Sequence, residues 1–217
     1  MNQGWRAYWE KTNPDKFMIS HLPRTEKVRE LYFTQASEIL KRGNRILDVG
    51  CGPAMDYPMW RDAGYRYFGV DFTQQFIDYA NEKYGEEANL SLMDAKNLQF
   101  KNRRFHLAYS KDLLEHQPPG DWRKIIRELW RVTSKLMIIS FFLPPWDNST
   151  KHQKRDDGVW TNTYNKTEVF NHIMRFKNLN WLRINESMFH TPSSTNRKPK
   201  SHGWAVWTAM KSFCEED

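Results

Sequence analysis

The sequence lacks the features that stabilise small secreted proteins or anchor a chain in a membrane. It contains only two cysteines, Cys51 and Cys214, which are too few for a disulfide framework and too far apart for a zinc knuckle. No apolar run approaches the ~20 residues that a membrane-spanning helix needs. The first residues also lack the apolar core and small residues of a signal peptide. We therefore expect a reduced, cytoplasmic chain with no membrane span.

Aromatic residues and positive charge are abundant instead. Fifteen per cent of the 217 residues are aromatic, including ten Trp, which is more apolar area than a disordered chain carries. Lys and Arg outnumber Asp and Glu by 33 to 26, giving a net charge of +7. This charge favours an anionic partner such as RNA, or it forms a solvated basic surface. The local basic clusters lie at 101–104, 151–155 and 197–200.

Short apolar runs alternate with helical ones, which is typical of an α/β domain with a mainly parallel sheet. The last two apolar runs have no long helix between them, and this predicts an antiparallel hairpin at the end of the sheet. We expect strands at 45–49, 67–70, 90–93, 105–110, 135–142, 181–188 and 204–210, and helices at 25–41, 73–84, 122–133 and 166–175.

Two stretches show neither a helical nor a strand period. Residues 1–24 are rich in Trp and Tyr, and residues 144–165 form a polar stretch after the fifth strand. Loops longer than ~12–15 residues in a compact domain are usually functional or disordered. We expect 1–24 to form an N-terminal lid or cap and 25–217 to form a single domain. Within that domain, 144–165 is either a loop that faces the substrate or a solvated flap.

The strongest functional signal lies in residues 45–54. An apolar strand leads into Asp48 and then into Gly50 and Gly52, and a helix is expected to begin near Ala54. Glycines let the backbone approach a ligand closely, and a helix N-terminus offers unpaired N–H groups. Twenty-one residues past Gly50, Asp71 ends the second strand, where an acid accepts hydrogen bonds from ribose hydroxyls.

A third acid, Asp94, ends the third strand, where a carboxylate is placed to accept a hydrogen bond from the amino group of an adenine. Together these residues resemble the class I methyltransferases that use S-adenosylmethionine, over about residues 25–211. Residues 48–53 are similar to the first motif of that family, and residues 105–116 are similar to its fourth-strand motif. A dinucleotide dehydrogenase is disfavoured, because Met55 replaces the third glycine of its phosphate-binding fingerprint.

The resemblance implies a Rossmann-like, three-layer α/β sandwich whose mostly parallel, seven-stranded sheet has an antiparallel last strand. It also implies that the chain binds S-adenosylmethionine and releases S-adenosylhomocysteine. The residues it assigns to the cofactor follow the first four strands, joined by one arginine that would meet the cofactor's carboxylate. They are Asp48, Gly50, Cys51, Gly52, Asp71, Phe72, Asp94, Ala95, Ser110, Lys111 and Arg24.

Residues 112–116 supply two carboxylates and an imidazole. On a helix, Asp112, Glu115 and His116 would share one face, and His152 could join them around Mg²⁺, Mn²⁺ or Zn²⁺. This pattern is similar to that of ubiquinone-pathway O-methyltransferases and of small-RNA 2′-O-methyltransferases, in which a longer glutamate occupies the place of Asp112. The alternative, which we favour, is that no metal binds. Glu115 would then be an acid at the start of a helix, and His116 would be a packing residue. His116, Asp112 and His152 are the candidate catalytic residues.

Because a hydroxyl acceptor needs a base, these side chains favour transfer of a methyl group to oxygen on a small polar acceptor. Two alternatives stay open. An RNA methyltransferase of the 2′-O type, with or without a metal, would explain the basic clusters. A non-catalytic subunit that binds S-adenosylmethionine would explain the carboxylates without turnover. The sequence assigns no oligomeric state.

Overall fold

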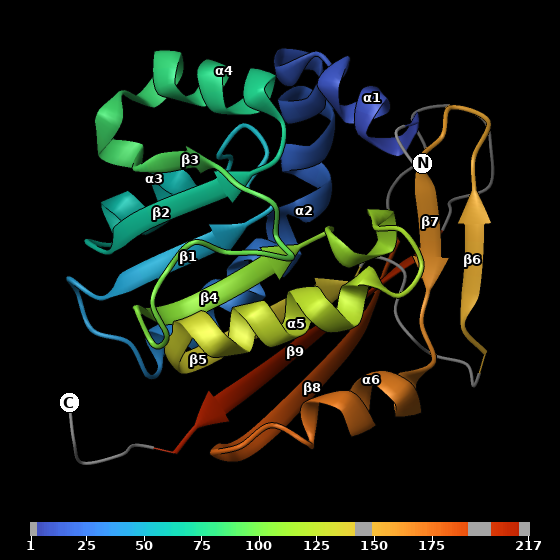
Figure 1. Ribbon diagram of the computed structural model, residues 1–217. Coiled ribbons are helices and arrows are strands. Elements are labelled where there is room, and N and C mark those ends of the chain that lie inside the picture. The colour runs from blue at the N-terminus through green and yellow to red at the C-terminus, as the bar shows by residue number, and fades with distance from the viewer. Residues whose placement is uncertain (1–3, 142–148, 191–200, 213–217) are drawn as a thin grey trace.

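The computed structural model describes residues 4–141, 149–190 and 201–212. A seven-stranded sheet of order β3-β2-β1-β4-β5-β9-β8 lies at its centre (Figure 1). The first five strands of that order run parallel, whereas β9 pairs antiparallel with both β5 and β8. These strands are β1 (Arg45–Val49), β2 (Arg66–Asp71), β3 (Leu90–Leu92), β4 (Phe105–Lys111), β5 (Thr133–Phe141), β8 (Leu179–His190) and β9 (Ser201–Lys211).

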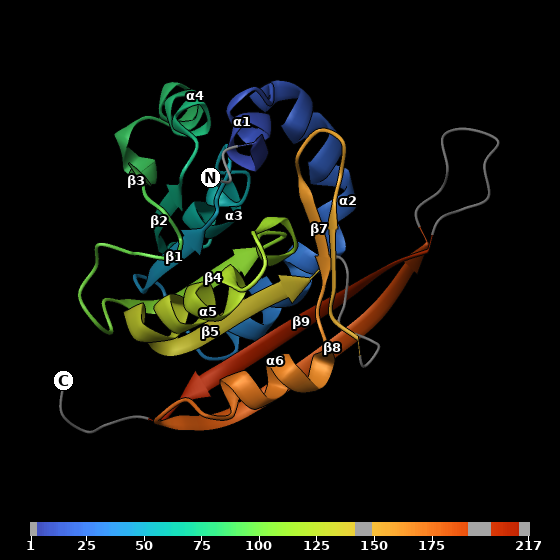
Figure 2. The same ribbon diagram turned by 45° about the vertical axis from the view of Figure 1, so that its right-hand side comes forward.

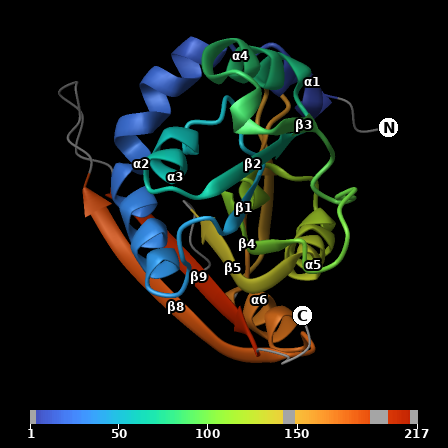
Figure 3. The ribbon, with the colours of Figure 1, turned by 90° about the vertical axis from the view of Figure 1, so that its left-hand side faces the viewer.

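Helices cover both faces of this sheet, which confirms the expected three-layer sandwich (Figure 3). One face packs against α2 (Pro14–Ser37), α3 (Tyr57–Asp62) and α4 (Gln74–Tyr84). The other face packs against α5 (Asp121–Val132) and α6 (Lys166–Ile173). None of the described helices combines the length and hydropathy that crossing a membrane requires.

The two faces carry separate hydrophobic cores, because successive side chains of a strand point to opposite sides. In β5, Leu136 and Ile138 pack into the core under α2, whereas Met137 and Ile139 pack into the core under α5. All four side chains are at most 1% exposed. Burial on both faces gives β5 the continuous apolar run that made it recognisable in the sequence.

The N-terminal stretch is helical, which corrects the expectation that 1–24 contains no regular element. A short helix, α1 (Gly4–Glu10), precedes α2, and α2 begins eleven residues before the predicted helix at 25–41. The side chain of Asn13 caps α2 by accepting a hydrogen bond from the backbone N–H of Lys16 at 3.0 Å. Pro14 follows at the first helical position, where the missing N–H costs nothing.

The segment 144–165 contains a β-hairpin in its described part, so the expectation of an irregular stretch was wrong there too. β6 (Lys151–Lys154) pairs antiparallel with β7 (Trp160–Thr163) in a separate two-stranded sheet. Figure 2 shows this hairpin standing beside the main sheet, with its loop near α1. All four residues of β6 are exposed, and they therefore lack the alternation of apolar and polar residues that marks a half-buried strand. Residues 144–148 lie outside the described residues.

Candidate functional site

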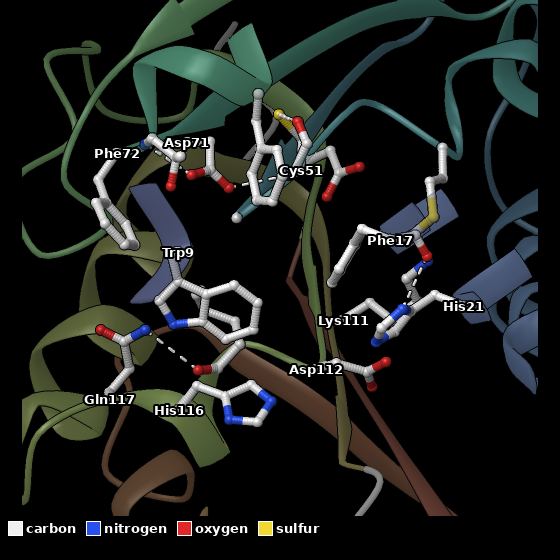
Figure 4. Close-up of a pocket in the computed structure, with 17 residues that line it drawn as sticks. Trp9, Phe17, His21, Cys51, Asp71, Phe72, Lys111, Asp112, His116 and Gln117 are labelled. Atoms are coloured by element: carbon white, nitrogen blue, oxygen red, sulfur yellow. Dashed lines mark hydrogen bonds between the residues drawn. The ribbon is translucent and has the colours of Figure 1, made fainter. Parts of the chain in front are cut away.

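A cavity opens at the carboxyl ends of β1, β2 and β4, beneath α1 and the first turns of α2 (Figure 4). It brings together many of the residues that the sequence singled out, from three strand ends. Those that line it are Asp48, Gly50, Cys51, Gly52, Asp71, Phe72, Lys111, Asp112 and His116.

The glycine loop after β1 needs its glycines. Gly50 and Gly52 have φ angles of +77° and +53°, which side chains rarely tolerate. A Cβ atom at residue 50 would also lie 2.8 Å from Cδ1 of Leu113. The backbone N–H groups of Gly50 and Cys51 both donate to the carbonyl oxygen of Val70, at 2.8 and 3.0 Å, which fastens the loop to β2. The helix that follows begins at Tyr57, three residues later than expected.

Asp71 connects the glycine loop to the end of β2. Its carboxylate accepts backbone N–H bonds from Gly52 at 2.9 Å and from Thr73 at 2.8 Å, and the residue is only 7% exposed. Burial raises the pKa of Asp71, and the two N–H bonds oppose that rise. Each carboxylate oxygen can accept a further hydrogen bond. Asp71 can therefore receive the hydroxyls of a ligand in the cavity while it holds the loop.

A second carboxylate, Asp56, was missed by sequence reasoning. Its side chain is 1% exposed and accepts from Nε of Arg29 at 2.7 Å, from Nζ of Lys111 at 3.1 Å and from the hydroxyl of Tyr32. Burial opposes its charge, but Lys111 and Arg29 outweigh burial and lower the pKa of Asp56. This network ties α2, the glycine loop and β4 together under the cavity floor. No local spacing in the sequence marks Asp56, because its partners come from other elements.

Asp48 lies beside this network at the end of β1. It is 3% exposed and accepts a hydrogen bond from the hydroxyl of Tyr67 at 2.8 Å. Burial, reinforced by the negative charge of Asp56, raises the pKa of Asp48 to about 7. The two carboxyls therefore differ in charge at neutral pH, with Asp56 fully ionised.

Asp112 occupies the exit of β4 in a left-handed conformation, with φ at +54°. Its side chain faces the cavity in Figure 4. Its Oδ1 atom has no hydrogen-bond partner among the described residues. Burial raises the pKa of Asp112 to about 7. Near neutral pH, both the ionised and the protonated form of this carboxyl are therefore populated.

His116 packs in the cavity wall. Nδ1 lies 2.8 Å from the carbonyl oxygen of Trp160 in β7, and because a carbonyl only accepts, this nitrogen carries the proton. The ring also packs against Trp9 of α1, with centroids 5.2 Å apart. Burial lowers the pKa of His116 to about 4, so the imidazole is neutral over the physiological range.

His21, on α2, also lines the cavity and was not among the predicted site residues. Its ring stacks on Phe17 with centroids 3.9 Å apart, and Nδ1 lies 2.9 Å from the carbonyl oxygen of Phe17. Burial lowers the pKa of His21, and the positive charges of Arg24 and Lys111 lower it further. Only the packing of α2 over the strand ends brings this histidine to the cavity.

Several predicted residues do not line the cavity. Asp94 forms an ion pair with Arg6 of α1 at 2.6 Å, and Arg24 is exposed on α2. His152 lies on β6 and contacts the Oδ1 atom of Asn162 at 3.0 Å. Ala95, Ser110 and Glu115 also lie outside the lining. The binding and catalytic roles of these residues stay predictions.

The shared helical face of the candidate metal ligands Asp112, Glu115 and His116 does not form. Asp112 precedes the 3₁₀ turn η2 (Leu114–His116) in a left-handed conformation, so that it shares no helical face with Glu115 and His116. Across the described ranges, no group of three or more His, Cys, Asp or Glu side chains is arranged to hold a metal ion.

The β6–β7 hairpin meets α1 above the cavity. The guanidinium of Arg155 lies 5.9 Å from the ring centroid of Tyr8. A Cβ atom at Gly158 would lie only 2.9 Å from the carbonyl oxygen of Gly4, so the two backbones approach closely. No residue of 149–165 lines the cavity itself. The idea that this segment faces a substrate therefore stays a prediction.

Residues 46–135 match a family model described as a methyltransferase domain. The chain is 27% identical over 115 residues to a phosphatidylethanolamine N-methyltransferase of Cereibacter sphaeroides, a match that covers 49% of this chain and 55% of that protein. It is 28% identical over 127 residues to a malonyl-[acyl-carrier protein] O-methyltransferase of Pectobacterium atrosepticum, covering 58% and 47%. The chain thus spans about half the length of these relatives.

Solved structures show the same fold. An S-adenosylmethionine-dependent methyltransferase of Methanosarcina mazei superposes with a TM-score of 0.63 at 19% identity, covering 81% of this chain and 95% of that one. The magnesium protoporphyrin IX methyltransferase of Synechocystis, solved with bound S-adenosylmethionine, gives 0.60 at 16% identity, covering 97% and 90%.

Proposed function

We propose that the chain is a class I S-adenosylmethionine-dependent methyltransferase and that it transfers a methyl group to an oxygen atom of a small polar acceptor. The observation that carries this proposal is the single cavity that joins the glycine loop and Asp71 to the polar side chains at the exit of β4. The first group fits a methyl donor, and the second fits an acceptor.

The residues present fit S-adenosylmethionine. The glycine loop lines the cavity at Gly50, where a Cβ atom would meet the Leu113 side chain. Asp71 lines the cavity with its carboxylate held by two backbone N–H groups. We assign Asp71 to the ribose hydroxyls and the loop backbone to the methionine part. When bound, S-adenosylmethionine supplies an already activated methyl group, so the protein contributes mainly by placing the acceptor.

The acceptor side of the cavity favours oxygen. His21, Asp112 and His116 gather around the exit of β4 (Figure 4). A hydroxyl must lose its proton on methylation, and a positioned base typically contributes ~10²–10⁴-fold to such a step. The same cavity would have to hold the donor and the reacting part of the acceptor together.

The test is methyl transfer from labelled S-adenosylmethionine to separate pools of small hydroxyl compounds, small amines and total RNA, each with and without EDTA. We expect label in a hydroxyl compound. Label in amines alone would contradict oxygen as the target atom. Label in RNA that fades steeply with salt, as binding through phosphates does, would favour the RNA alternative. Tight cofactor binding without product from any pool would favour a non-catalytic subunit.

A further inference from the structure

Because the proposed transfer to oxygen requires a base, this inference rests on the proposed function. We propose that His21 is the general base of this site and that the acceptor is a small aryl hydroxyl, a phenol or catechol, lying against a wall of aromatic rings. The proposal differs from the sequence-based expectation, which named His116 and His152 as the candidate histidines.

The hydrogen bonds of His21 select one tautomer. Nδ1 lies 2.9 Å from the carbonyl oxygen of Phe17 and 2.8 Å from Oγ of Ser20. Because the Ser20 hydroxyl itself donates to that carbonyl, at 3.0 Å, and a carbonyl only accepts, the proton of the ring belongs on Nδ1. Nε2 then carries a lone pair on the edge of the ring opposite the Phe17 carbonyl oxygen. In Figure 4 that side lies toward Lys111 and Asp112.

The surroundings keep His21 neutral and thus ready to accept a proton. Burial lowers its pKa, the hydrogen bond to the Phe17 carbonyl opposes that fall, and two cations, Arg24 on its own helix and Lys111 on β4, lower the pKa further. The other titratable groups of this part of the cavity are His116, which burial keeps neutral, and Asp112, whose pKa is about 7. In Figure 4 the carboxyl of Asp112 lies beside the His21 ring, and its ionised form would compensate an imidazolium when the proton arrives.

His116 is the weaker alternative. Its pKa of about 4 makes it a poor proton acceptor at neutral pH, and its ring is held between Trp160 of the hairpin and Trp9 of α1. His152 sits on the exposed strand β6, outside the cavity lining. Of the described histidines, only His21 and His116 line the cavity, and the ring edge of His21 opposite its hydrogen bond to Phe17 lies toward Lys111 and Asp112 in Figure 4.

The aromatic wall favours a flat ring as the acceptor. His21, Phe17, Trp9 and His116 contact one another in series, with centroid separations of 3.9, 6.1 and 5.2 Å. Such a surface offers ring faces and edges to an aromatic molecule. It offers few partners for the several hydroxyls of a sugar, which would lose hydrogen bonds to water. A phenol requires only one polar partner, and Nε2 of His21 supplies it.

The step balances without another reagent. The acceptor's O–H bond breaks and its proton passes to Nε2 of His21, while an oxygen electron pair forms the new bond to the methyl carbon. The carbon–sulfur bond breaks and its electron pair stays on sulfur, which leaves S-adenosylhomocysteine and the methyl ether. The imidazolium then returns its proton to solvent.

The first test needs no acceptor. Two-dimensional ¹⁵N–¹H NMR of the histidine rings in the full chain, with His21→Gln used to assign the signal, reports tautomer and pKa. We expect the Nδ1–H tautomer and a pKa below 6.5. The Nε2–H tautomer, or a pKa above 6.5, would overturn the proposal.

The second test measures turnover with monocyclic phenols and catechols, using cyclohexanols as matched acceptors without an aromatic ring. We expect product from the phenols and not from the cyclohexanols. His21→Gln should lower kcat at least ~10²-fold while the Kd for S-adenosylmethionine stays within about threefold. His21→Asn, which keeps an N–H for the Phe17 carbonyl, should behave alike. His172→Gln is the control, because that histidine also bonds a backbone carbonyl and has a lowered pKa but lies outside the cavity.

The pH profile separates a base from a merely structural residue. Because only neutral His21 accepts a proton, wild-type kcat/KM should fall as pH drops through the lowered His21 pKa, and His21→Gln should lose this acid limb. If wild type and His21→Gln methylated phenols at the same rate, His21 would not be the base, whereas the proposed function would stand. Turnover only of amines, sugars or RNA would refute the aryl acceptor. Bound donor with no product from any acceptor would refute the proposed function itself.

Discussion

Replacing Asp56 by asparagine removes the negative charge that two buried cations share. Arg29 and Lys111 have side chains that are 17% and 9% exposed, and both meet the 1%-exposed carboxylate of Asp56. Removing one partner of a buried ion pair costs about 3–5 kcal/mol, because the remaining charge stays buried without compensation. Since asparagine keeps the volume and one acceptor oxygen, we expect a loss of about 3 kcal/mol, at the lower end of that range.

For a chain of this length, such a loss corresponds to a fall in Tm of roughly 6–12 °C. Urea unfolding at pH 7.5 measures the free energy directly, and Asp62→Asn is the matched control. Asp62 pairs with Arg61 at 2.8 Å but is 66% exposed, and exposed pairs contribute only about 0–1 kcal/mol. Asp56→Asn combined with Arg29→Met should cost less than the sum of the single changes, by about 0.5–3 kcal/mol. A loss below about 1 kcal/mol for Asp56→Asn, equal to that of the control, would refute the idea that this network holds α2 to the glycine loop.

Three further outcomes follow from the cavity wall. Asp71→Ala should weaken S-adenosylmethionine binding by about 1.5–3 kcal/mol for each charged hydrogen bond lost, and calorimetric titration with an unchanged Kd would contradict the ribose assignment. Gly50→Val should abolish S-adenosylmethionine binding while circular dichroism shows a retained fold, because residue 50 has a φ of +77° and its side chain would collide with Leu113. A normal binding titration of this variant would contradict the expectation. Asp48→Asn should stabilise the protein more at pH 8 than at pH 5, because a folded pKa raised to about 7 makes the wild type lose stability as pH rises between about 4 and 7. Equal urea midpoint shifts at both pH values would count against it.

The sheet could be predicted because its strands are buried on both faces and read as short apolar runs. β1 was predicted with its exact bounds, Arg45–Val49, and the others within about two residues, apart from β9. The antiparallel arrangement of β8 and β9 is confirmed as well. The β6–β7 hairpin was missed, because β6 is exposed throughout and stabilised by pairing rather than by burial.

The candidate site was predictable only where one strand end supplies the residue. Asp48 and Asp71 lie in the last residues of β1 and β2, and Gly50 follows β1 directly. Sheet geometry alone brings such residues together. His21 reaches the cavity through the packing of α2, and Asp56 is held by partners 24 to 55 residues away. Pairings of that kind leave no periodic trace in a sequence. Asp94 illustrates the converse, since its position was foreseen but its ion pair with Arg6 was not.

The strand order has a consequence for the time course of folding. β9 is the last described strand in the chain, yet it lies inside the sheet between β5 and β8. During synthesis, β5 must wait until residues 201–211 have left the ribosome before its second edge is paired. Its residues 136–141 are at most 1% exposed in the finished fold, and an unpaired apolar edge of this kind recruits other chains. A translation product that stops before residue 201 should therefore aggregate, and a chaperone that shields β5 would raise the yield of folded protein.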